Sequence, residues 1–236
     1  YSDMAVGIAR IMNINIPVNF NSPYKAYGII EFWSRWHISL TNTITNYIYT
    51  PIVMSFKKIT FAKAMFATFL AMLIAGIWHG AGWTFIIFGA LHGLGLILNH
   101  VWKKYKLFMW RPMGYFLTGI LILTANVFFR AESISDALKV FEAMLGFNGI
   151  IFVNFVTDTE VQRIARIIRF FIPTINLKTE LPYVLAISSL IIFICPNSNR
   201  IVDKKFSWLS FLFILVLLAL SIFSLSKASD FVYFQF

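Results

Sequence analysis

Residues 61–104 read FAKAMFATFLAMLIAGIWHGAGWTFIIFGALHGLGLILNHVWKK. Two apolar runs lie in this stretch, at 61–78 and 83–102, and each is about as long as an α-helix that crosses a bilayer. A Gly-Ala-Gly turn separates them. Because short connections join antiparallel neighbours, the stretch predicts a tight hairpin of two membrane-spanning helices.

Three further apolar runs follow this hairpin along the chain, at 113–129, 181–195 and 206–225. The composition also fits a protein within the lipid bilayer, since 59% of the 236 residues are hydrophobic and 13% are charged, against about 25% charged in soluble proteins. We therefore expect an all-α membrane protein, a multi-spanning helical bundle with re-entrant or interfacial helices. The five spans are predicted to form one domain over 1–236.

The net charge of +10 comes mainly from clusters between the apolar runs. This placement is typical of loops that face anionic lipid, and it argues against nucleic acid as a partner. The positive-inside rule makes these loops cytoplasmic and places His79 toward the outer half of the membrane. The clustered residues are Lys57, Lys58, Lys103, Lys104, Lys106, Arg111, Lys204 and Lys205.

Some segments are too polar to be simple spans. Residues 28–50 are rich in aromatic side chains, and we expect a helix there that lies partly in the membrane or is re-entrant. Residues 133–145 predict an amphipathic helix capped by Ser133, with Asp136 in the third position of a capping box. Residues 159–171 predict a second one, whose basic face suits the membrane interface.

His79 is the first candidate for chemistry, in the sequence Trp78-His79-Gly80. Ionisable groups inside a membrane are costly and often functional. An imidazole there suits a general base, because its ordinary pKa is close to physiological pH. The alternative is a structural histidine whose ring is hydrogen-bonded to a carbonyl.

His37 is the second candidate, in EFWSRWHISL at residues 31–40. On a continuous helix, Trp33, Trp36, His37 and Leu40 would share one face, and Glu31 and Arg35 would form an ion pair on another. The alternative is an interfacial aromatic belt with a surface ion pair.

His92 lies between Gly89 and Gly93, a spacing that lets two helices pack closely, so a structural role is favoured. The histidines lack the usual spacing of zinc ligands, and no metal site is predicted. The single cysteine, Cys195, excludes an intrachain disulfide.

Taken together, these motifs resemble the membrane-bound O-acyltransferase family, in its alginate O-acetyltransferase-like branch. The pair FWSRWHISL and GIWHGAGW, in this order, is highly specific. The matching part is the C-terminal half of the usual chain, and the sequence opens at Tyr1, so we expect a fragment. The matching stretches are 1–24, 31–52, 75–96, 126–145 and 231–236.

The resemblance implies that His79 and His37 are catalytic. It implies transfer of an acyl group, expected to be acetyl, from a cytoplasmic thioester donor to a hydroxyl group. The donor would be acyl-CoA or an acyl carrier, with no bound cofactor. The acceptor would be an extracytoplasmic polysaccharide or a relay partner, an extracytoplasmic acetyltransferase. The setting would be the lipid of the bacterial inner membrane, crossed several times. Residues expected to line or support the substrate tunnel are Trp33, Trp36, Trp78, Arg35, Ser39 and His92.

Two other functions stay open at this point. Intramembrane histidines also mark transport paths, so the chain could be a transporter. It could also be a scaffold subunit of a complex for polysaccharide export or modification.

Overall fold

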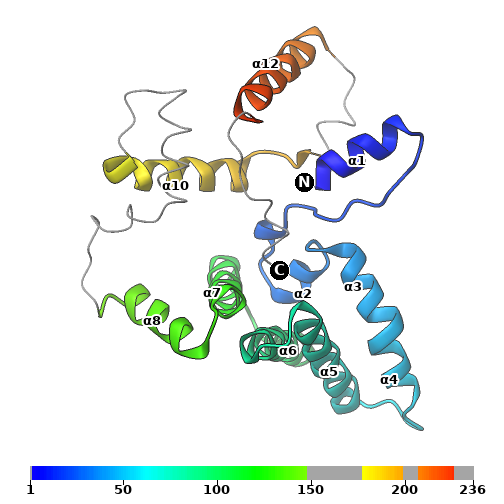
Figure 1. The fold of residues 1–236 in the computed structure, drawn as a ribbon. Coiled ribbons are helices and arrows are strands. Elements are labelled where there is room, and N and C mark those ends of the chain that lie inside the picture. The colour runs from blue at the N-terminus through cyan, green and yellow to red at the C-terminus, as the bar shows by residue number, and fades with distance from the viewer. Residues whose placement is uncertain (1, 148–176, 199–206, 226–236) are drawn as a thin grey trace. The chain divides into compact units, whose positions relative to one another are not determined.

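The computed structural model describes residues 2–147, 177–198 and 207–225 (Figure 1). The backbone contacts divide the chain into two compact units, Tyr1–Leu145 and Gly146–Phe236, and each is described by itself. Every regular element in the described residues is a helix, which confirms the all-α fold class. The single domain over 1–236 stays a prediction.

Three helices of the first unit are long and apolar enough to cross a membrane: α5 (Phe61–His79), α6 (Trp83–Lys104) and α7 (Arg111–Arg130). Their ends lie within two residues of the predicted boundaries. At the start of α5, the Thr60 hydroxyl accepts a hydrogen bond from the Lys63 backbone N–H at 3.4 Å. This cap fixes where the first span begins.

Helices α5 and α6 form the predicted hairpin, and glycines lie where they cross. A Cβ atom on Gly89 would lie 2.5 Å from the Met72 carbonyl oxygen and 3.2 Å from the Gly76 Cα. A Cβ on Gly93 would lie 2.9 Å from the Phe69 side chain. Because these glycines have no side chain, the two helices can approach closely, as the spacing of Gly89 and Gly93 in the sequence predicted.

The segment before α5 is also helical (Figure 1). Its helices are α1 (Ser2–Ile11), the 3₁₀ turn η1 (Pro23–Lys25), α2 (Ile29–Trp33), α3 (Ile38–Ile44), the π-helical turn η2 (Thr45–Tyr49) and α4 (Thr50–Met54). The last three, α3, η2 and α4, follow one another without a break. Helix α2 packs against α6, whereas η2 and α4 pack against α5.

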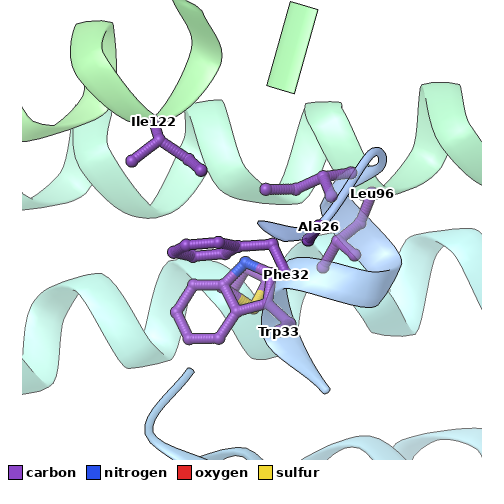
Figure 2. Close-up of a cluster of buried hydrophobic side chains, with 7 residues drawn as sticks. Ala26, Phe32, Trp33, Leu96 and Ile122 are labelled. Carbon is purple, nitrogen blue, oxygen red and sulfur yellow. The ribbon is translucent and has the colours of Figure 1, made fainter. Parts of the chain in front are cut away.

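Figure 2 shows the main apolar core of this unit. The rings of Phe32 and Trp33 from α2 lie among Met72 of α5, Leu96 of α6 and Ile122 of α7, and all five side chains are at most 8% exposed. A second cluster contains Ile44 of α3 with Ala71 and Ala75 of α5, so α5 packs against both α2 and α3. The core thus fixes the tryptophan-rich segment against the spanning hairpin.

Helix α8 (Ile134–Met144) confirms the capped amphipathic helix, because the Ser133 hydroxyl accepts from the Asp136 backbone N–H at 3.1 Å. The predicted helix at 159–171 lies outside the described residues. In the second unit, α10 (Leu177–Ile194) and α12 (Trp208–Leu225) form where the fourth and fifth spans were expected. That these two cross the membrane stays a prediction.

Candidate functional site

His79 is the last residue of α5, at the point where three spanning helices meet. Its half-buried ring lies edge-on to Phe88 of α6, with ring centroids 5.8 Å apart, and to Phe129 of α7, at 5.0 Å. Trp78 also contacts it at 4.9 Å, but the Trp78 side chain is 64% exposed. Aromatic rings from α6 and α7 thus cover one side of the imidazole.

His92 lies deeper in the same unit, and only 2% of it is exposed. Its ring is 4.6 Å from Phe88 and 5.1 Å from Trp33, both in edge-on geometry. Phe88 therefore contacts both His92 and His79. The Nδ1 atom of His92 is buried and has no hydrogen-bond partner within the described part of the chain. Such an atom costs stability unless something binds it.

The backbone at His37 corrects the sequence prediction. Helix α2 ends at Trp33, and His37 takes the left-handed conformation, with φ at 44°, just before α3 begins. The expected single helical face of Trp33, Trp36, His37 and Leu40 is therefore wrong. The predicted ion pair is confirmed, since the Arg35 guanidinium donates to the Glu31 carboxylate at 2.5 Å.

The physical reason for this break is a loop nearly twenty residues earlier in the chain. The Ile38 N–H donates to the Asn19 carbonyl at 3.0 Å. The Asn19 side-chain oxygen accepts from the Ser39 N–H at 3.0 Å and from the Ser39 hydroxyl at 2.9 Å. Nearby, the Asn21 N–H donates to the Arg35 carbonyl at 2.9 Å. These bonds replace helical ones, and their only sequence signal is the Asn/Pro-rich composition around Asn19, which is typical of a turn.

One aromatic ring contacts His37 directly. Phe20, from the same loop, has its ring centroid 5.9 Å from His37 and 4.9 Å from Trp36. Trp36 in turn stacks on Phe32 at 5.6 Å. Burial lowers the pKa of His37 from its ordinary value, and its buried Nδ1 has no partner among the described residues. His37 is thus an uncharged imidazole at neutral pH, with a ring nitrogen available to a ligand.

The fold brings three histidines into one cluster. His79 is close enough to both His37 and His92 for their charges to interact. Ring contacts also connect them in an unbroken series: His79, Phe88, His92, Phe32, Trp36, Phe20 and His37. We call these seven residues the histidine–aromatic cluster. Of the other expected site residues, Trp33 borders this cluster, whereas Ser39 and Trp78 are exposed.

A pocket of about 470 Å³ lies beside this cluster, between the tryptophan-rich segment, α5 and α6. Trp33 lines it, and the three clustered histidines do not. Two of its lining residues, Met65 and His100, come from the ends of α5 and α6 that carry Lys63 and Lys104, opposite to His79. Its polar lining comes from Ser34, Thr41, Asn42, Thr45, Tyr49 and Thr68.

Lysines gather at this end of the hairpin. The Lys104 ammonium lies 4.1 Å from the centre of the Phe61 ring, which joins the end of α6 to the start of α5. The Lys63 ammonium lies 5.1 Å from the Phe56 ring and donates to the Lys58 carbonyl at 3.2 Å. The pocket therefore lies toward the basic end of the molecule, and the cluster around His79 toward the other. Within the described ranges, no three His, Cys, Asp or Glu side chains are grouped to hold a metal ion.

Comparison with known proteins gives one family match and several similar proteins. The match is to "MBOAT, membrane-bound O-acyltransferase family" over residues 2–132. The chain is 43% identical over 155 residues to "Peptidoglycan O-acetyltransferase" of Helicobacter pylori, covering 64% of this chain and 29% of that protein. It is 37% identical over 148 residues to "Probable alginate O-acetylase AlgI" of Pseudomonas aeruginosa, covering 62% of this chain and 28% of that protein.

A more distant similarity is to "Teichoic acid D-alanyltransferase" of Bacillus subtilis, which is 32% identical over 129 residues, or 52% of this chain and 33% of that protein. The chain thus spans about a third or less of the length of these relatives. The matched region 2–132 contains the three clustered histidines and the pocket.

Proposed function

This chain belongs to the membrane-bound O-acyltransferase family, and we propose that it carries the reaction centre of a membrane O-acyltransferase. The acyl group would be acetyl, as the names of two relatives suggest. The donor would be a cytoplasmic thioester, either acyl-CoA or an acyl carrier. The acceptor would be a hydroxyl of an extracytoplasmic polysaccharide or a relay partner enzyme. The protein would cross the bacterial inner membrane several times.

The observation that carries this proposal is the histidine–aromatic cluster. It holds two half-buried imidazoles, His79 and His37, at the two ends of one series of rings. Apolar rings exclude water, and in a dry site hydrogen bonds and charges act more strongly. A thioester reaching such a site would be protected from hydrolysis while the acceptor is deprotonated.

In the proposed step, the neutral imidazole of His79 takes the proton of the acceptor hydroxyl. The hydroxyl oxygen attacks the thioester carbonyl carbon, a C–O bond forms and the C–S bond breaks. The proton then passes from His79 to the leaving thiolate, so the histidine is regenerated. His37, uncharged because burial lowers its pKa, can donate a hydrogen bond to the carbonyl oxygen, where negative charge develops.

The two ends of the hairpin suit opposite substrates. The pocket lies toward the lysine-rich end, which the positive-inside rule makes cytoplasmic, and we assign it to the donor. His79 lies at the far end of α5, 19 residues along, or about 28 Å at 1.5 Å per residue. This end suits an acceptor that approaches from outside the cell.

The test is to replace His79 in the full-length protein and measure ester-linked acetate on the envelope polysaccharides of the bacterium. His79→Ala should lower the acetate released by mild alkali at least ~100-fold, the usual contribution of a general base. Ile77→Ala is a matched control, because Ile77 is also on the last turn of α5 but is 53% exposed and lies outside the cluster.

Both variants should reach the membrane in normal amounts, as measured by immunoblotting of membrane fractions. Full acetylation by a normally inserted His79→Ala protein would refute the proposal. That outcome would favour the scaffold, which does not need this imidazole.

A further inference from the structure

Trp33 occupies a boundary between the pocket and the histidine–aromatic cluster. Its side chain lines the pocket, and its ring also lies edge-on to His92, with centroids 5.1 Å apart at an interplanar angle of 80°. His92 does not line the pocket. The indole therefore forms the wall of the pocket that faces His92.

This wall is firmly held. Trp33 is 7% exposed and packs in the core with Met72 and Leu96, which also line the pocket. Behind it, the Thr41 hydroxyl is within 3.3 Å of the Trp33 carbonyl and 3.2 Å of the Trp36 carbonyl. The indole therefore cannot rotate far without displacing the side chains of α5 and α6 that pack against it.

The indole also carries an unused polar atom. Its Nε1 is buried and has no hydrogen-bond partner in the described part of the chain. A buried donor without a partner lowers stability unless a ligand binds it.

We propose that Trp33 determines which acyl chains the protein accepts, by closing the inner end of the donor pocket. The proposal rests on the proposed function, because it needs an acyl donor in that pocket. A two-carbon acyl group stops short of the indole, whereas a longer chain needs the space that the ring fills. A volume of about 470 Å³ is within the range of ~300–1,000 Å³ that ligand pockets have.

The test uses inverted membrane vesicles that contain the full-length protein, supplied with acetyl-, butyryl- or octanoyl-CoA. The initial rate of thiol release is measured for each donor, and the rate of vesicles with the His79→Ala protein is subtracted. Trp33→Ala should raise the butyryl-to-acetyl ratio of kcat/KM about tenfold or more, since one or two methylene groups in an apolar pocket carry such factors.

Two further variants complete the design. Trp33→Phe keeps an aromatic ring and so protects the fold, and it should move the ratio in the same direction by a smaller factor. Trp36→Ala is the matched control, because Trp36 is on the same segment, stacks on Phe32 and does not line the pocket. It should leave the ratio unchanged, whatever it does to the rate.

Each outcome bears on the proposal. A rise in the ratio for both Trp33 variants, with Trp36→Ala at the wild-type ratio, would support it. An unchanged ratio in Trp33→Phe or in folded Trp33→Ala would overturn the assignment of Trp33 and leave the proposed function standing. The absence of any rate that depends on His79 would instead refute the proposed function, and this inference with it.

Discussion

Gly89 offers a direct test of how the spanning hairpin is packed. A methyl group on this residue would meet backbone on α5, 2.5 Å from the Met72 carbonyl oxygen and 3.2 Å from the Gly76 and Leu73 Cα atoms. Backbone cannot turn away as a flexible side chain can. Gly89→Ala must therefore push the two helices apart.

The size of the effect follows from these distances. Carbon–oxygen contacts of this kind are normally about 3.3–3.6 Å, so the crossing must widen by ~1 Å. Overpacking usually costs about 1–3 kcal/mol, whereas Ala in a helix is favoured over Gly by ~1 kcal/mol. Gly119→Ala on α7 isolates the packing term, because nothing lies within 4 Å of a Cβ added there. It should gain the helical preference alone, so the two variants should differ by the overpacking cost, about 1–3 kcal/mol.

The assay is thermal unfolding of the full-length protein in one detergent, followed by intrinsic fluorescence. For 150–250 residues 1 kcal/mol moves Tm by about 2–4 °C, so the apparent Tm of Gly89→Ala should be roughly 2–12 °C below that of Gly119→Ala. Gly89→Ala should also lose activity per folded molecule, up to ~100-fold, because a shift of 1 Å displaces the groups that flank the reaction. Equal Tm values for the two variants would refute the close crossing of α5 and α6.

Two further predictions concern the segment around His37. Asn19→Ala removes the acceptor of two hydrogen bonds from Ser39, so it should cost roughly 1–3 kcal/mol and lower acetyl transfer more than it lowers membrane abundance. Asn46→Ala serves as the control, because Asn46 is exposed and does not line the pocket, and an equal loss in both variants would contradict the role of Asn19. Burial lowers the pKa of His37, so below pH 6.5 the unfolded chain binds a proton at this residue more readily than the folded chain. The free energy of unfolding therefore decreases as the pH is lowered. Wild-type protein should therefore lose more Tm than His37→Asn between pH 7.5 and pH 5.5, and parallel losses would show that His37 is not buried as described.

The spanning helices could be predicted from sequence because their signal is local. The start of α5 at Phe61 and the turn at Gly80–Gly82 follow from a cap, long apolar runs and glycines within one window. Ser133 likewise fixed the start of α8. Each of these boundaries depends on residues a few positions apart, which is the range that periodicity and capping rules describe.

The site depends on contacts over longer distances in the chain. Nothing within EFWSRWHISL shows that Asn19 replaces helical hydrogen bonds at Ile38 and Ser39, so His37 was placed on a helix that does not exist there. The contact of Phe88 with both His79 and His92 also requires the crossing of two helices. Tertiary contacts overrode local propensity in the first case and created the site in the second.

The left-handed backbone at His37 has a consequence for any mutational survey of this family member. This residue serves two purposes, since its backbone makes the turn and its ring lies in the cluster. Alanine removes the ring and also resists this backbone conformation, so its defect would combine misfolding with lost chemistry. Asparagine tolerates the conformation without an imidazole. Comparing the two substitutions would separate the architectural contribution of position 37 from its chemical one, which an alanine scan alone would merge into a single exaggerated effect.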